Sequence, residues 1–258
     1  MTLIDVHCHY EDPKFDGDLN EILPDLEKQN VFAISAGCTV EHSIYTQKLA
    51  HQYKNVFFCA GIHPQDAHTF NEEDFNRLKE LYSDEKCVAV GEIGLDYYWE
   101  NNPPKEKQIE VFLRQAELAK EVNLPVEIHS REATGDMLEL LKKHDISYGL
   151  MHCFSGSRET AKFCLDQGLY FSFGGTCTFK NARKAIENLE YIPRDRILLE
   201  TDSPYLAPVP VRGTRNDSRN LIHIASHIAY LWGVSVDTVA EITTNNALSL
   251  FKKLKIED

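Results

Sequence analysis

Eight short apolar segments recur along the chain, and metal-binding residue types follow six of them. The segments cover residues 4–6, 31–36, 56–60, 88–91, 125–128, 148–151, 169–173 and 197–200. Between them lie stretches with apolar residues every three to four positions, which is typical of helices packed on one face. These stretches are 18–29, 40–53, 72–82, 105–122, 132–144, 157–167 and 180–190, and the last segments, 217–232 and 235–251, read as closing helices. Strands that alternate with helices predict a parallel sheet with right-handed crossovers.

Eight such units predict closure of the sheet into a barrel. The chain has 258 residues, close to the roughly 250 typical of one (β/α)8 barrel. No shift in composition and no linker divides it, so we expect an α/β fold, a single-domain TIM barrel spanning residues 1–258. An open, doubly wound sheet is the alternative. Functional residues of such barrels lie at the carboxyl ends of the strands.

His7 and His9 follow the first apolar segment and are two residues apart. Side chains alternate between the faces of a strand, so Asp5, His7 and His9 are expected to share one face. Two imidazoles placed in this way can chelate one ion, and Asp5 could orient one of them. For this motif taken alone, the alternative is a pair of core histidines whose ring nitrogens are hydrogen-bonded within the protein.

Four more residues of metal-binding type end other apolar segments: Glu92, His129, His152 and Asp202. A carboxylate at the end of a buried strand needs a partner. A salt bridge to arginine would satisfy Glu92, but we interpret it as a carboxylate that bridges two cations. One ion would be held by His7, His9, Glu92 and Asp202, and the other by Glu92, His129 and His152. Mixed imidazole and carboxylate ligands suit Mg, Mn, Zn, Co or Ni.

This centre predicts metal-assisted hydrolysis. Asp202 is the candidate general base, Glu92 is the second catalytic candidate, and Glu200 on the same strand face is a plausible orienting partner. Glu127 lies two residues before His129, where an apolar residue is expected. It either supports His129 or is an irregularity of the barrel interior.

Four residues are candidates for binding the substrate's phosphates: His63, Arg131, Arg212 and Arg215. Arg212 and Arg215 belong to a loop after the last strand, where barrels often bind phosphate, and an arginine fork matches phosphate geometry. Structural roles are the alternatives, namely a histidine packed beside Pro64 and arginines paired with acids. The aromatic residues 97–99 could stack on bases or pack within their loop.

The formal net charge of −13 argues against tight, sequence-independent wrapping of nucleic acid, although it does not exclude a nucleic-acid substrate. No apolar run is long enough to span a membrane, and the first residues lack a secretory signal. The seven cysteines include no CxxC pair and are expected to be reduced. We therefore expect a cytoplasmic protein without a membrane partner, and a monomer by default.

The ordered motifs resemble those of the TatD family of metal-dependent deoxyribonucleases, within the wider amidohydrolase-like barrels. The motifs are residues 5–9 (DVHCH), 61–64 (GIHP), 91–97 (GEIGLDY), 128–131 (IHSR), 152–156 (HCFSG) and 200–206 (ETDSPYL), followed by 212–216 and 246–247. The resemblance runs from Asp5 to about Phe251. It implies a deoxyribonuclease with two divalent metal ions, often a 3′–5′ exonuclease on single-stranded DNA, with ligand roles on the six residues named above.

Two other functions remain open on the residues alone. The same metal centre could hydrolyse amides, lactones or small esters, and the phosphate-binding arginines would then not matter. A non-enzymatic metal-binding protein is the more remote alternative. It predicts that metal removal lowers stability without abolishing any turnover.

Overall fold

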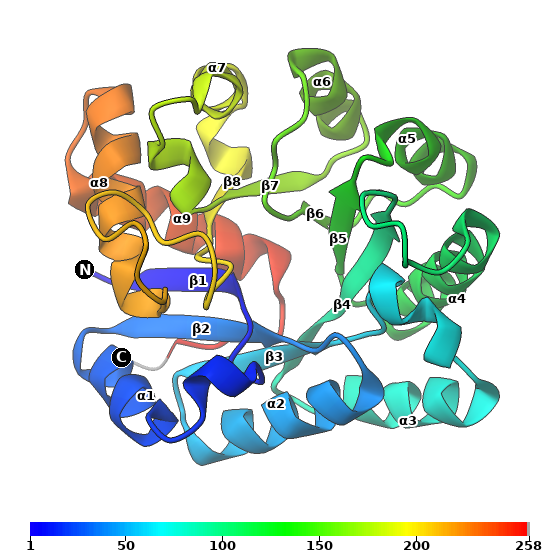
Figure 1. Cartoon of the computed structure of the whole chain (residues 1–258). Coiled ribbons are helices and arrows are strands. Elements are labelled where there is room, and N and C mark those ends of the chain that lie inside the picture. Colours follow the sequence, from blue (N-terminus) through cyan, green and yellow to red (C-terminus); the bar gives the residue numbers. More distant parts are fainter. Residues whose placement is uncertain (257–258) are drawn as a thin grey trace.

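Eight parallel strands form one sheet in which each strand pairs with the next along the chain (Figure 1). The computed structural model describes residues 1–256. The strands are β1 (Leu3–Cys8), β2 (Val31–Ala36), β3 (Val56–Ala60), β4 (Cys87–Asp96), β5 (Val126–Arg131), β6 (Gly149–Met151), β7 (Tyr170–Phe173) and β8 (Ile197–Leu199). The segment after β8 returns to β1, because the Asp202 amide donates to the His7 carbonyl at 3.0 Å. The predicted TIM barrel is confirmed, and the open sheet is excluded.

Helices surround the strands (Figure 1). They are α1 (Leu19–Lys28), α2 (Val40–Gln52), α3 (Glu72–Tyr82), α4 (Lys105–Val122), α5 (Thr134–Lys143), α6 (Arg158–Asp166), α7 (Arg183–Tyr191), α8 (Leu221–Trp232) and α9 (Val236–Leu250). Short 3-10 turns lie in the loops at η1 (Pro13–Phe15), η2 (Pro64–Thr69), η3 (Gly175–Thr178), η4 (Arg194–Arg196) and η5 (Ser218–Asn220). The helices lie where the apolar periodicity predicts them, within about one turn.

The buried apolar side chains form two layers. One cluster joins the outward faces of the strands to the helices. The other joins residues of strands that are not neighbours, such as Ile34 of β2 and Leu150 of β6, so these side chains meet in the barrel interior. Leu250 and Phe251, at the end of α9, belong to the interior cluster. Apolar packing therefore fills the amino end of the barrel and leaves the carboxyl end for polar chemistry.

Three strands that carry site residues are longer than their apolar segments. β1 continues through Cys8, β4 through Asp96 and β5 through Arg131, so His7, Glu92 and His129 lie within strands and not after them. The pairing of β4 with β5 shifts register between Val90 and Ile93. A bulge of this kind re-aims side chains, and it lies where Glu92 turns into the barrel mouth.

All seven cysteines are free, as expected. Among residues 1–256, no helix is both long and apolar enough to cross a bilayer.

Candidate metal centre

A cavity of about 520 Å³ opens at the carboxyl ends of the strands. Five of the six predicted ligands line it: His9, Glu92, His129, His152 and Asp202. The sixth, His7, is fully buried and adjoins them. The structure thus gathers residues from β1, β4, β5 and the ends of β6 and β8 at one place.

The first donor set contains His7, His9, Asp202 and one oxygen of Glu92. The Nε2 atoms of His7 and His9 are 2.9 Å apart. Asp202 Oδ1 lies 3.6 Å from His7 Nε2 and 3.5 Å from His9 Nε2. Glu92 Oε2 lies 3.6 and 3.7 Å from the same two nitrogens. Ligands about 2.1 Å from one tetrahedral ion are ~3.4 Å from each other, and these five separations are close to that value. His7, His9 and Asp202 each offer a ligand atom within 4.8 Å of the others.

The second donor set contains His129, His152 and the other oxygen of Glu92. Glu92 Oε1 lies 2.7 Å from His129 Nδ1 and 3.0 Å from His152 Nε2. The two ring nitrogens are 3.3 Å apart. Because Oε1 faces this set and Oε2 faces the first, the Glu92 carboxylate has the geometry of a bridge between two cations.

No lysine or arginine of the described residues pairs with the carboxylates of Glu92 and Asp202. In residues 1–256, the ion pairs of these two carboxylates involve histidines alone. Glu92 is 3% exposed, and a buried carboxylate without a cation is costly. The donor set is therefore suited to divalent metal ions.

The four ligand histidines share a second feature, which is a carboxylate beside the ring nitrogen that faces away from the centre. Glu127 Oε1 lies 2.8 Å from His7 Nδ1, and Glu11 Oε1 lies 2.9 Å from His9 Nδ1. Each carboxylate holds the proton on Nδ1 and leaves the Nε2 lone pair directed at the centre. Such partners fix the tautomer and raise the basicity of a metal ligand.

The same arrangement holds for the second donor set. His129 Nε2 lies 3.3 Å from Asp96 Oδ2, which leaves Nδ1 free to coordinate. His152 Nδ1 lies 3.5 Å from Glu200 Oε2, beyond hydrogen-bond range but within an ion-pair distance. Glu200 thus accompanies His152, whereas the sequence suggested only a general orienting role. Sequence reasoning missed Glu11 and Asp96. It offered His129 as the residue that Glu127 supports, whereas Glu127 contacts His7.

His63 differs from these four histidines. Its Nδ1 accepts a hydrogen bond from the Gln65 amide at 3.2 Å, so the neutral ring carries its proton on Nε2. That nitrogen lies 3.6 Å from Glu92 Oε1. Burial lowers the pKa of His63 to about 3, which keeps the ring neutral. In this tautomer His63 presents an N–H donor to the centre, and its ring also lies close enough to Glu92 and His129 for the three residues to share an ion.

The charges of the centre are strongly coupled. Burial disfavours the ionised form of Glu92, but the histidines around it, His152 first, outweigh burial and hold its pKa well below the usual range. Burial also opposes ionisation of Asp202, yet its hydrogen bond with His9 helps to lower the pKa. Burial acts against the charged form of His152, while Glu92 and Glu200 raise its pKa well above the ordinary value. The carboxylates attract positive charge, and metal ions can replace the imidazole protons that supply it.

Asp5 does not orient an imidazole ring, contrary to the expectation. Its Oδ1 accepts from the His7 amide at 3.3 Å and from the Thr201 amide at 2.8 Å, and its Oδ2 accepts from Ser218 Oγ at 2.6 Å. The pairing of β1 with β2 shifts register between Asp5 and Cys8. This irregularity breaks the alternation on which the expectation rested. Burial raises the pKa of Asp5 to about 7.

Among the predicted phosphate-binding arginines, only Arg131 reaches the cavity, and it is the one lysine or arginine in the described lining. Its guanidinium carbon lies 3.8 Å from the centre of the Tyr98 ring and 5.5 Å from that of Trp99. Both rings are about half exposed. Tyr97, by contrast, donates its hydroxyl to Asp136 and is partly buried.

Arg212 and Arg215 do not line the cavity. Arg215 pairs with Asp18 and donates to the Lys14 carbonyl at 2.7 Å. Arg212 is exposed and lies over the Phe179 ring at 4.1 Å. The loop that carries both arginines turns away from the metal centre, which the sequence could not indicate.

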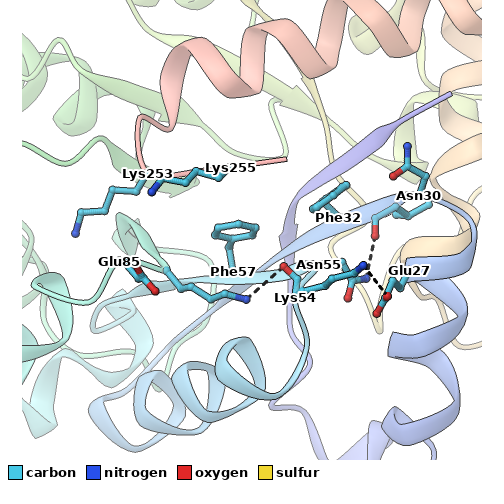
Figure 2. A pocket seen from close by; sticks show the side chains of 11 residues that line it. Glu27, Asn30, Phe32, Lys54, Asn55, Phe57, Glu85, Lys253 and Lys255 are labelled. Carbon is cyan, nitrogen blue, oxygen red and sulfur yellow. Dashed lines mark hydrogen bonds and ion pairs between the residues drawn. The ribbon is translucent and has the colours of Figure 1, made fainter. Parts of the chain in front are cut away.

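A second cavity, of about 450 Å³, lies at the amino ends of the strands (Figure 2). Its lining includes four lysines: Lys54, Lys86, Lys253 and Lys255. Lys86 Nζ donates to the carbonyl of Ala50 at 2.6 Å and to three other carbonyls of residues 53–56. Lys54 Nζ pairs with Glu27 Oε1 at 3.1 Å.

Comparison with known proteins gives consistent similarities. Residues 4–252 match the family model described as TatD related DNase. A Bacillus subtilis protein named uncharacterized metal-dependent hydrolase YabD is 42% identical over 253 residues, covering 97% of this chain and 99% of that protein. Human deoxyribonuclease TATDN3 is 35% identical over 271 residues, covering 99% of this chain and 96% of the human protein.

A solved structure supports the same relationship. The crystal structure of YjjV, a TatD homologue from Escherichia coli K12, superposes with a TM-score of 0.90 at 30% identity. The superposition covers 97% of this chain and 98% of YjjV.

Proposed function

The chain belongs to the family of TatD-related DNases and is a metal-dependent hydrolase, and from this premise we propose that it cleaves the phosphodiester bonds of single-stranded DNA from the 3′ end with two divalent cations. One observation carries the proposal. The two oxygens of Glu92 face two separate donor sets, and each ligand histidine has a carboxylate beside its outer nitrogen. A two-cation centre of this kind is a recurrent solution for phosphate-ester hydrolysis.

The site residues have three roles, which are binding of the cations, acceptance of a proton from water and binding of phosphate. His7, His9, Glu92 and Asp202 would hold one cation, and Glu92, His129 and His152 the other. When bound, the cations supply Lewis-acid stabilisation of the charge that builds on the phosphoryl oxygens. The choice among Mg, Mn, Zn, Co and Ni depends on availability as well as on the ligands.

Asp202 is the proposed base. Its Oδ1 faces His7 and His9, whereas Oδ2 has no hydrogen bond or ion pair within the described chain. The lowered pKa of Asp202 keeps it ionised at neutral pH. A free carboxylate oxygen at the edge of the cavity can accept the proton of the attacking water.

Phosphate binding falls to Arg131 and His63. Arg131 supplies the charge, and its stacking on Tyr98 limits the conformations that it loses on binding. His63 supplies a neutral Nε2–H donor, as argued from its Gln65 contact. The exposed rings of Tyr98 and Trp99 are platforms on which a base can stack.

The position of the centre favours a single strand. His7 and Glu92 are buried at the floor of a cavity lined by loops. We infer that a frayed or single-stranded end reaches these buried groups more readily than the phosphates of an intact duplex. The 3′–5′ polarity follows from the family resemblance and has to be tested separately.

The test uses end-labelled oligonucleotides, single-stranded and duplex, with labels at either end. The chelator-stripped protein should be inactive, and Mg or Mn should restore cleavage of single strands from the 3′ end. If the label at the 5′ end were released first, the polarity would be 5′–3′ and not 3′–5′. A protein that turns over an amide or lactone far better than any phosphodiester would support the small-molecule hydrolase instead.

A further inference from the structure

A groove leads away from the metal cavity across the loop that follows β6. It consists of two hollows, which we call together the strand groove. The first, of about 520 Å³, lies between the starts of α5 and α6, and the second, of about 920 Å³, lies between the starts of α6 and α7. Each is as large as a site that encloses a small molecule, about 300–1,000 Å³.

The hollows are continuous with the metal cavity. The first shares Ser130, Arg131, His152, Cys153 and Ser155 with that cavity. The first and second hollows share residues 154–157 and Lys184. A chain molecule whose end lies at the metal centre therefore has an unbroken path to α7.

The charge changes along this path. The metal cavity is lined by six Asp or Glu residues and one arginine, Arg131. The strand groove is lined by four Lys or Arg residues, Arg131, Arg158, Arg183 and Lys184, and by three Glu residues, Glu132, Glu159 and Glu187. In a chain with a net charge of −13, a groove with more cations than acids is a local exception, and it suits an anionic polymer.

Lys184 is the residue best placed to bind it. Its side chain is exposed, lines both hollows, and has no ion pair or hydrogen bond with any part of residues 1–256. Arg183 beside it is already paired with Glu187 at 2.8 Å. Lys184 thus carries a free charge where the two hollows meet, beside residues 155–157, which also line both.

Apolar surface accompanies the charge. Phe179, which is partly exposed, lines the far hollow beside the buried Phe154, and Arg212 lies over the Phe179 ring. Aromatic surface beside cations is the combination that binds single strands, because bases stack while phosphates pair. Arg212, which does not reach the metal cavity, is placed to meet the distal part of such a strand.

We propose that the strand groove is the track of the single-stranded polynucleotide, which passes from the metal cavity over Arg131 to Lys184 and on toward Phe179. The inference rests on the proposed nuclease function. It assigns the body of the strand to a defined side of the barrel mouth, between α5 and α7. It also predicts that binding strengthens with length until the groove is filled.

The test compares Lys184→Ala with Lys143→Ala. Lys143 is also exposed and without a partner in the described chain, but it lies at the other end of α5 and outside the groove. Binding of fluorescent phosphorothioate oligonucleotides to metal-free protein gives a readout that does not need catalysis. Cleavage of di-, tetra- and dodecanucleotides by the metal-loaded enzyme gives KM against length.

For the dodecanucleotide, Lys184→Ala should raise Kd and KM about tenfold, as for the loss of one charged phosphate contact. The slope of log K against log salt should fall by about 0.7. The dinucleotide and the Lys143→Ala variant should match wild type. If wild type binds and cleaves single strands but the two variants do not differ at any length, the track is wrong while the nuclease stands. If wild type binds with dependence on Lys184 but does not cleave, the track survives and the nuclease fails. Wild-type protein that neither binds nor cleaves overturns both.

Discussion

The charged groups at the two ends of the barrel differ in where their partners come from. At the amino end, lysines gather around a cavity (Figure 2), and Lys54, Lys86 and Lys253 each have partners within the protein. At the carboxyl end, the carboxylates of Glu92 and Asp202 meet histidines and no lysine or arginine of the described chain. Three of the four lysines at the amino end thus have partners within the protein, whereas the carboxylates at the carboxyl end need cations from solution.

This difference separates structural charge from functional charge. Lys86 donates hydrogen bonds to carbonyls at the end of α2 and in β3. These contacts stabilise the fold and leave no role for the lysine in binding a ligand. The four outer carboxylates at the carboxyl end direct histidine lone pairs inward, where the protein offers nothing to receive them. Lone pairs that converge without a protein donor are what metal ligation requires.

The largest expected effect is that of Asp202→Asn. The amide keeps the shape of the side chain but cannot act as a base, so kcat should fall by about 10²–10⁴-fold. Steady-state kinetics with saturating metal measure this, and circular dichroism checks folding. A kcat within about tenfold of wild type would remove Asp202 from the role of base.

The next effect tests the carboxylates behind the histidines. Glu127 bonds to His7 Nδ1, and its Oε2 accepts from Cys59 Sγ at 2.6 Å. Glu127→Gln should weaken metal affinity about tenfold and Glu127→Leu about a hundredfold, with kcat largely restored by excess metal. Glu27→Gln at the amino end is the control, and it should change unfolding by less than about 1 kcal/mol. Equal metal titrations for Glu127→Leu and wild type would contradict the orienting role.

A smaller effect concerns the arginines. Arg131→Ala should raise KM for oligonucleotides about tenfold with little change in kcat, since binding in the ground and transition states is lost together. Arg212→Ala should have at most about a threefold effect, seen with long strands alone. Arg215→Ala should leave the kinetics unchanged because Asp18 and the Lys14 carbonyl already hold its side chain. If Arg212→Ala or Arg215→Ala raised KM more than Arg131→Ala does, phosphate binding would instead belong to the loop after β8.

The smallest effect on activity belongs to the amino end. Lys86→Met leaves at least two buried carbonyls without their donor, so the free energy of unfolding should fall by about 2–3 kcal/mol. Denaturant unfolding measures that loss. The kcat of the folded variant should stay at the wild-type value, and a loss of turnover would mean that the two ends are coupled.

Much of this fold is predictable from local pattern. The bounds of β2, β3 and α4 agree with the apolar segments 31–36 and 56–60 and with the helical stretch 105–122. The prediction stopped short in β4, because Gly91 and Gly94 interrupt the apolar run. The strand nevertheless continues, with a bulge and with Gly94 at a φ of +151° where a side chain would collide with the His129 carbonyl.

The site was predictable only in part. The six candidate ligands could be named because each ends an apolar segment. Glu11 and Asp96 could not, because their value depends on which ring nitrogen they face. The partners of Arg215, Asp18 and Lys14, lie 197 and 201 residues away in the sequence, and no local signal identifies them. Tertiary contacts decide which charges are satisfied and which remain available.

The most direct test of the account is the number of metal ions per chain in wild type, Glu92→Ala and His129→Ala, measured by elemental analysis after metal loading and desalting. Glu92 contributes an oxygen to both donor sets, so we predict two ions in wild type and at most one in Glu92→Ala. His129→Ala should keep the ion held by His7, His9 and Asp202. Two tightly bound ions in folded Glu92→Ala would contradict the bridging carboxylate on which the account rests.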